Sequence, residues 1–173
     1  MATEARRGDL AIVGAGSIWD GIAYWPTVLG VYLMVGGLFF YSGKQKLFDQ
    51  HGHPPAAIKQ QFSNTFVSTF PGIHAIWIIL GVLEFAIFAI LVLSLLRGEF
   101  LPHRSKSAMQ VALAVALVTF ACLAFGQTST GQFAGTASLY QYFGATTVIL
   151  ILVSLLPPNR PDSWLRFGAS PPP

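Results

Sequence analysis

Residues 73–96 read IHAIWIILGVLEFAIFAILVLSLL, and Glu84 is the only Asp, Glu, Lys or Arg among them. A helix needs about 20 mainly apolar residues to cross the roughly 30 Å hydrocarbon core of a bilayer, at about 1.5 Å per residue. This stretch is long enough and apolar enough to do so. It therefore predicts a membrane-spanning helix that carries one acid near its centre.

Three further apolar runs flank this helix, and the Lys and Arg residues fall between the runs rather than within them. Only 10% of the 173 residues are charged and 53% are hydrophobic, too few charges to cover a water-facing globule. The chain is therefore predicted to be an all-α polytopic membrane protein, a bundle of four transmembrane helices spanning residues 26–156. The other three spans are predicted at 26–43 (PTVLGVYLMVGGLFFYSG), 107–125 (SAMQVALAVALVTFACLAF) and 139–156 (LYQYFGATTVILILVSLL).

Charge on the connecting segments predicts the orientation of the bundle. With four spans, both termini lie on the same side as the loop between the second and third spans, and that side holds seven Lys/Arg against three on the other. Positive residues favour the cytoplasm, so we expect both termini there, in a bacterial inner (plasma) membrane. Residues 1–25 are predicted to be a cytoplasmic or interfacial segment without a secretory signal, and 157–173 a Pro-rich cytoplasmic tail. The sequence pI near 9.2 is explained by these flanking cations, so it does not indicate a nucleic-acid partner.

The long connection at residues 44–72 has a helical pattern of its own. An apolar residue recurs at every fourth position between Pro54-Pro55 and Pro71-Gly72. These residues therefore share one helix face: Ile58, Phe62, Phe66 and Phe70. We predict a short amphipathic helix on the outer membrane surface, whose simplest role is to cover the mouth of the bundle. The uncharged loop 126–138 is predicted either to hydrogen-bond within that mouth or to be a flexible connection.

Glu84 is the leading candidate for a functional site. A carboxylate in the middle of a span costs at least about 2.5 kcal/mol, so it should face the bundle interior and find partners. Lys44 and Lys46 are expected about 14 Å nearer the outer surface, which argues against a salt bridge. Without a cation, burial favours the protonated acid. Its predicted hydrogen-bond partners, at similar depth in the third and fourth spans, are Thr119, Tyr142, Thr146 and Thr147.

Two interpretations of this polar cluster stay open. It is either a site that carries a proton or a polar ligand, or a set of hydrogen bonds that only joins helices. Trp77, Tyr140 and Tyr142 lie toward the outer ends of their spans, where they form an aromatic belt or line a pocket for quinone or lipid.

Cysteine and histidine usage restricts the cofactors. Cys122 is the only cysteine, which excludes an intrachain disulfide and a Cys-held iron–sulfur cluster. No histidine lies deep in a span, so a haem held by two histidines is not expected. His51 and His53 form a weak candidate metal pair, with exposed loop histidines as the alternative. We predict no resident cofactor or metal, with quinone or lipid as the possible small-molecule ligands.

Three segments together resemble the DoxX-like family of small bacterial four-helix membrane proteins. They are GGLFFYSGKQKLFD at the end of the first span, the mid-helix acid in GVLEFAIF, and the turn GQFAGTASLYQYFGA before the last span. The resemblance covers about residues 26–156 and carries over to Gly43, Lys46 and Glu84. It implies association with quinone-linked or redox-defence membrane assemblies, although the absence of a cysteine pair weighs against direct sulfur chemistry.

These observations lead to three hypotheses. The first is an accessory protein, without activity of its own, that associates with the subunits of a redox or respiratory membrane complex. The second is a protein that binds quinone, lipid or a proton around Glu84. The third is a purely structural subunit. Membrane lipids and other membrane protein subunits are the expected partners, and the small residues in the spans also permit a homo-oligomer.

Overall fold

The computed structural model describes residues 24–156, and four helices in this part of the chain are long and apolar enough to cross a membrane. They are the first membrane helix (Tyr24–Asp49), α4 (Ile73–Leu96), α5 (Ser107–Ser129) and α6 (Phe133–Leu155). No strand is present in the described residues. The prediction of an all-α four-helix membrane bundle is therefore confirmed. The predicted segments 1–23 and 157–173 lie outside the described residues.

The first membrane helix is longer than predicted. It passes through a π-helical turn (η1, Val31–Val35), the regular helix α2 (Gly36–Lys44) and a second π-helical turn (η2, Gln45–Asp49). The prediction that it ends at Gly43, with both following lysines outside it, is wrong. Lys44 pairs with Asp49 at 2.8 Å, and Lys46 finds a partner on α4, so neither charge has to end the helix.

The other boundaries differ by more than one residue only in the connection between α5 and α6. The span predicted at 73–96 is α4 without change. The predicted uncharged loop 126–138 shrinks to a short turn at 130–132, because α5 runs on to Ser129 and α6 begins at Phe133. Hydroxyl groups in these added turns bond to carbonyl oxygens of their own helices, which lets polar residues continue a helix.

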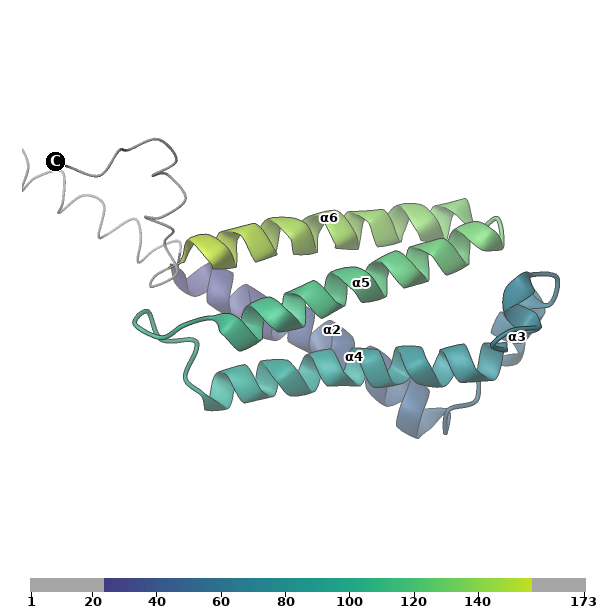
Figure 1. Ribbon diagram of the computed structural model, residues 1–173, viewed down its shortest axis with the longest axis horizontal. Coiled ribbons are helices and arrows are strands. Elements are labelled where there is room, and N and C mark those ends of the chain that lie inside the picture. Colours follow the sequence, from purple (N-terminus) through teal and green to yellow (C-terminus); the bar gives the residue numbers. More distant parts are fainter. Residues whose placement is uncertain (1–23, 157–173) are drawn as a thin grey trace, which may run out of the picture.

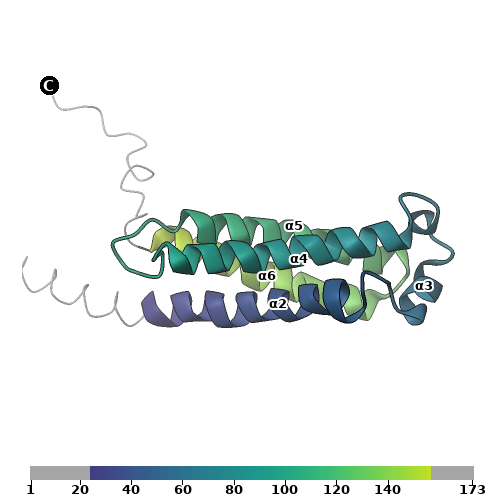
Figure 2. The ribbon, with the colours of Figure 1, turned by 90° about the horizontal axis from the view of Figure 1, so that it is seen from below.

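The helices pack as a row of three with the first helix laid against it. In Figure 1, α5 lies between α6 above and α4 below, and the first membrane helix passes behind them. Seen from below in Figure 2, the first helix runs along one side of α4. Side chains from all four helices form one hydrophobic core: it includes Val28, Val31, Phe39, Ile87, Leu91, Met109, Leu113, Ala116, Phe120 and Val153.

The predicted amphipathic segment is present, but it is not one continuous helix. It consists of α3 (Ala56–Phe62) and a 3₁₀ turn, η3 (Phe66–Ser68), at the end of the bundle where α4 begins (Figure 1). Phe70 is 80% exposed and lies outside this turn. We call this end of the bundle the α3 end, and the end with the loop between α4 and α5 the opposite end.

Candidate functional site

Glu84 and Lys46 form an ion pair inside the bundle. The Lys46 Nζ lies 2.7 Å from Glu84 Oε2 and 2.9 Å from Oε1, and it also donates to Ser42 Oγ at 2.8 Å. Glu84 is 1% exposed and Lys46 is 8% exposed. The expectation that no lysine reaches Glu84 is therefore wrong, and with it the premise that this acid is buried without a cation.

The first membrane helix and α4 approach each other closely at two glycines, and this brings Lys46 and Glu84 together. A Cβ added at Gly43 would lie 2.8 Å from the backbone nitrogen of Phe85, and one added at Gly81 would lie 3.1 Å from Lys46 Cβ. Each charged residue thus follows, by three positions, a glycine at which the first membrane helix and α4 touch. The repeated spacing Gly-x-x-Lys and Gly-x-x-Glu is the sequence signal that could have revealed the pair.

The depth estimate failed because the end of the first membrane helix and the beginning of α4 do not lie at the same level. Gly52, in the turn after the first membrane helix, lies against Ile78, where an added Cβ would be 3.2 Å from Ile78 Cγ1. Ile78 is five residues into α4, so the first helix ends about 8 Å deeper than α4 begins. This offset lowers Lys46 toward the level of Glu84.

The polar partners proposed for Glu84 lie elsewhere. Thr119 is buried but donates to the carbonyl of Val115, and Thr147 donates to the carbonyl of Phe143. Thr146 is buried on α6. Tyr142 is 50% exposed and stacks on Phe120 with ring centroids 5.8 Å apart. Within residues 24–156, none of these four side chains hydrogen-bonds to Glu84.

All three donors of the Lys46 ammonium are used. The three N–H groups of an ammonium match the two Glu84 oxygens and the Ser42 hydroxyl, so no donor is left over. The Lys46 Nζ also lies 5.2 Å from the centre of the Trp77 ring. A paired and buried carboxylate of this kind joins two helices, and both the structural and the functional interpretation of Glu84 stay predictions.

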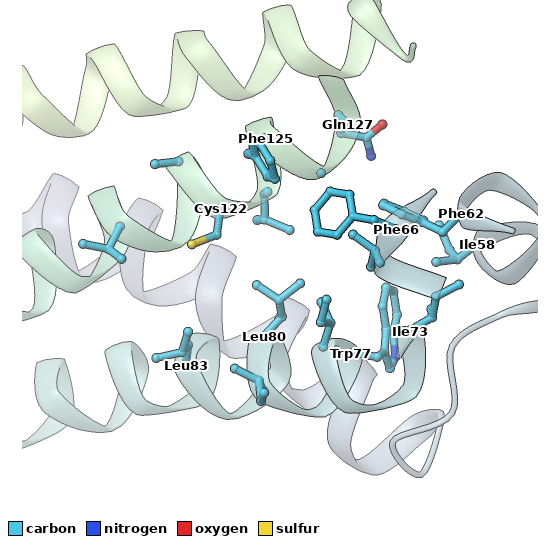
Figure 3. Close-up of a pocket in the computed structure, with 17 residues that line it drawn as sticks. Ile58, Phe62, Phe66, Ile73, Trp77, Leu80, Leu83, Cys122, Phe125 and Gln127 are labelled. Atoms are coloured by element: carbon cyan, nitrogen blue, oxygen red, sulfur yellow. The ribbon is translucent and has the colours of Figure 1, made fainter. Parts of the chain in front are cut away.

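An apolar pocket of about 630 Å³ lies on another face of α4, between α4 and α5 at the α3 end. In Figure 3, Leu80 and Leu83 of α4 face Cys122 and Phe125 of α5 across this space, and Phe62 and Phe66 close one end of it. Glu84 is absent from its walls. Nearly all of the lining is hydrocarbon or aromatic ring, so the pocket suits an apolar molecule or hydrocarbon chain.

The α3 segment covers this pocket and is held in place by side-chain hydrogen bonds and by an aromatic contact. Gln61 Nε2 donates to Gln127 Oε1 at 3.1 Å and to Thr130 Oγ1 at 2.9 Å, which ties α3 to the end of α5. The rings of Phe66 and Phe125 lie 6.2 Å apart. The amphipathic segment is therefore the roof of a pocket, which extends its predicted role as a cover.

Trp77 and Cys122 line this pocket, whereas Tyr140 does not. Trp77 forms part of its wall, and its indole nitrogen is a buried donor without a partner in the described residues. Cys122 also lines the pocket and is a free, exposed thiol. Tyr140 belongs instead to a smaller hollow of about 300 Å³ between α5 and α6.

The opposite end holds a second buried acid that the sequence analysis missed. Glu99 is 4% exposed and accepts hydrogen bonds from the backbone N–H groups of Ala108 at 3.1 Å and Met109 at 3.0 Å, in the first turn of α5. Ser94 donates to it at 2.9 Å. Glu99 therefore caps α5 from the preceding loop, where no common capping pattern announces it.

Lys106, beside this cap, is fully buried and donates to the carbonyls of Leu101 and Arg104 at 2.7 and 2.6 Å. Burial lowers the pKa of Lys106, and the Glu99 carboxylate acts in the opposite sense. Loop carbonyls, rather than a salt bridge, solvate this cation.

The histidines of the α3 end pair differently from the predicted candidate. His53 Nδ1 lies 3.1 Å from His74 Nε2 at the first turn of α4, whereas His51 and His53 form no side-chain hydrogen bond or ring contact with each other in the described part of the chain. No three His, Cys, Asp or Glu side chains among residues 24–156 come together as a set of metal ligands.

The described residues form a four-helix membrane protein with an apolar pocket covered by the α3 segment and a buried ion pair beside it. Comparison of the chain with protein-family models, curated proteins and solved structures finds no match. The resemblance to DoxX-like proteins through Gly43, Lys46 and Glu84 therefore stays a prediction. The association with a redox complex that it implies stays a hypothesis.

Proposed function

We propose that this protein binds a small apolar molecule, such as a quinone or a lipid, with its hydrocarbon part in the pocket between α4 and α5. The observation that carries this proposal is the pocket of about 630 Å³, whose walls come from two membrane helices and whose roof comes from the α3 segment. Its volume lies within the range of about 300–1,000 Å³ usual for small-molecule sites.

The roof supports a specific site rather than a plain lipid-facing groove. Four apolar side chains of the roof line the pocket although the segment sits at the end of the bundle: Ile58, Phe62, Phe66 and Val67. A groove filled only by bulk lipid needs no such cover. The side chain of Gln127 supplies the amide group in the lining, at the roofed end. A ligand would therefore place its chain between the helices and its polar group near Gln127 (Figure 3).

Co-purification tests the proposal on the full-length chain. The protein is isolated in a mild detergent, and bound molecules are counted by native mass spectrometry and identified after extraction. We expect one apolar ligand per chain that survives exchange into fresh detergent. Recovery of the protein with only the bulk lipid mixture, in proportions that match the membrane, would overturn the proposal.

A matched pair of substitutions on α5 locates the site. Ala121 lines the pocket, and Ala114 is an exposed alanine two helical turns away on the same face. Ala121→Phe places a ring where the ligand would lie, and a loss of about 1–3 kcal/mol of binding free energy corresponds to roughly 5–150-fold weaker retention. Ala114→Phe should retain the ligand as the wild type does. Equal retention by both variants would place the ligand elsewhere.

The single cysteine offers a second measurement without further substitution. Cys122 lines the pocket, so a bound ligand should slow its reaction with an apolar maleimide. Stripping the ligand with detergent should restore the rate, and adding it back should slow the reaction again. An unchanged rate in all three states would contradict binding in this pocket.

A further inference from the structure

We propose that His53 and His74 form a binding site for a divalent late transition-metal ion, namely Cu²⁺, Ni²⁺ or Zn²⁺. The site lies at the α3 end, apart from the apolar pocket, and it is independent of the function proposed above. The ligands are Nδ1 of His53, in the turn after the first membrane helix, and Nε2 of His74, in the first turn of α4.

The separation of the two nitrogens fits a shared metal ion. A bond from imidazole nitrogen to such an ion is about 2.0–2.1 Å long, so two ligand nitrogens lie about 2.9 Å apart at a right angle and about 3.3 Å apart at the tetrahedral angle. The nitrogens of His53 and His74 are 3.1 Å apart, between these two values. Their rings are tilted by 52° with centroids 4.9 Å apart, so they do not stack on one another.

The turn that presents His53 is fixed by its backbone. His51 and Gly52 both have positive φ, at 49° and 73°, and the Gly52 N–H donates to the carbonyl of Lys46 at 2.9 Å. Gly52 also lies against Ile78, one helical turn beyond His74. Histidine is one of the few non-glycine residue types that adopt positive φ with some frequency, and here the backbone hydrogen bond and the contact with Ile78 fix the turn. The two imidazoles are thus brought together by two segments with fixed positions.

The remaining coordination positions are open to solvent. Asp49, the nearest acid in sequence, is engaged by Lys44 at 2.8 Å, and no third His, Cys, Asp or Glu completes the set among residues 24–156. Water would fill the other positions, as it does in sites with fewer than four protein ligands. Imidazole suits Cu²⁺, Ni²⁺ and Zn²⁺, and the general order of stability predicts that Cu²⁺ binds most tightly.

A hydrogen bond between the two neutral rings is the competing explanation for the same distance. Both side chains are exposed, so such a bond competes with water and contributes little to stability. Substitutions can separate the two explanations. Asn places a polar atom near the position of Nδ1, and Gln places one near Nε2, so His53→Asn and His74→Gln retain a hydrogen-bonding group but remove an imidazole ligand.

Metal titration of the detergent-solubilised full-length protein, carrying a tag without histidine, tests the site. Cu²⁺ and Zn²⁺ chlorides are added while binding is followed by calorimetry and the unfolding temperature by a thermal-shift assay. We expect saturable binding of one ion per chain, tighter for Cu²⁺, with a rise in unfolding temperature. His53→Asn and His74→Gln should each lose the saturable phase and the rise in temperature, with the unfolding temperature without metal unchanged.

Two matched controls make the outcome decisive. His51→Asn alters the neighbouring exposed histidine of the same turn, and His103→Gln alters the histidine of the loop at the opposite end. Both should bind like the wild type. The proposal is wrong if the wild type shows no saturable binding. It is also wrong if the His53 and His74 variants keep that binding, or if either the His51 or the His103 variant loses it.

Discussion

Two buried glutamates at different levels of the bundle are stabilised in different ways. Glu84, inside a membrane helix, meets a cation from another helix at 2.7 Å and has no other hydrogen-bond partner in the described residues. Glu99, at the opposite end, meets backbone N–H groups and two hydroxyls and forms no salt bridge within residues 24–156. One acid depends on a single charge, and the other depends on several neutral donors.

The difference follows from what each location offers. In the middle of a helix every backbone N–H is already used, so only a side chain from a neighbouring helix can stabilise a carboxylate there. At the start of α5 the first N–H groups have no partner within the helix, so a loop carboxylate can bind them. Loss of the one partner of Glu84 should therefore cost more than loss of charge at Glu99.

The largest expected effect comes from Lys46→Met. This change leaves Glu84 buried without its cation, and breaking a buried pair in this way typically costs about 3–5 kcal/mol. Unfolding in mixed micelles of increasing denaturing-detergent content, followed by tryptophan fluorescence, measures the loss. Lys44→Met is the matched control, because Lys44 pairs with an exposed Asp49 and such a pair contributes about 1 kcal/mol or less.

The double variant Lys46→Met/Glu84→Met completes this test. Removal of both charges leaves no unpaired carboxylate, so it should recover most of the stability lost in the single variant. If the double variant is as unstable as Lys46→Met, the loss reflects packing of the lysine stem rather than the charge pair.

A smaller effect is expected from Gly43→Ala, which tests how the pair is assembled. The added methyl would lie 2.8 Å from the backbone nitrogen of Phe85, and overpacking of this kind costs about 1–3 kcal/mol because backbone must move. Gly37→Ala, on the same helix with open space around it, should be neutral or stabilising by up to about 1 kcal/mol. Equal midpoints for the two variants in the same unfolding assay would show that the helices do not approach closely at Gly43.

The sequence predicted α4 to the residue because Glu84 is the only charged side chain in the apolar run from Ile73 to Leu96. It did not predict that the first helix continues past Lys44, since a lysine ends a hydropathic run unless its partner is known. Contact with the partner, Glu84, depends on the offset between the two helices. Hydropathy does not contain that offset, and the repeated spacing of a glycine three residues before each charge is the only hint of it in the sequence. The lining of the pocket was not predicted for a similar reason. Of the three aromatic residues proposed for a pocket only Trp77 belongs to it, because the lining comes from three segments that meet only in the folded chain.

Glu99 was missed because its role depends on a loop conformation. It lies eight residues before the start of α5, too far for a capping pattern that is read along the sequence. The Ser94 hydroxyl that donates to it is itself hydrogen-bonded to the Tyr32 hydroxyl at 2.9 Å, so the cap also contacts the first membrane helix. Such a set of contacts exists only after the helices have packed.

The smallest effect is expected from Glu99→Gln. The amide keeps one acceptor oxygen, so only part of the cap is lost, at a cost of about 0.5–2 kcal/mol, typical of helix N-caps. Asp49→Asn, an exposed acid, is the control and should change the midpoint less.

A double-mutant cycle then compares the two acids directly. Coupling between Glu99 and Lys106 should be well below that between Glu84 and Lys46, because carbonyls rather than Glu99 bind the Lys106 ammonium. Equal coupling energies would mean that both acids depend on a cation, and the contrast between the two ends of the bundle would be lost.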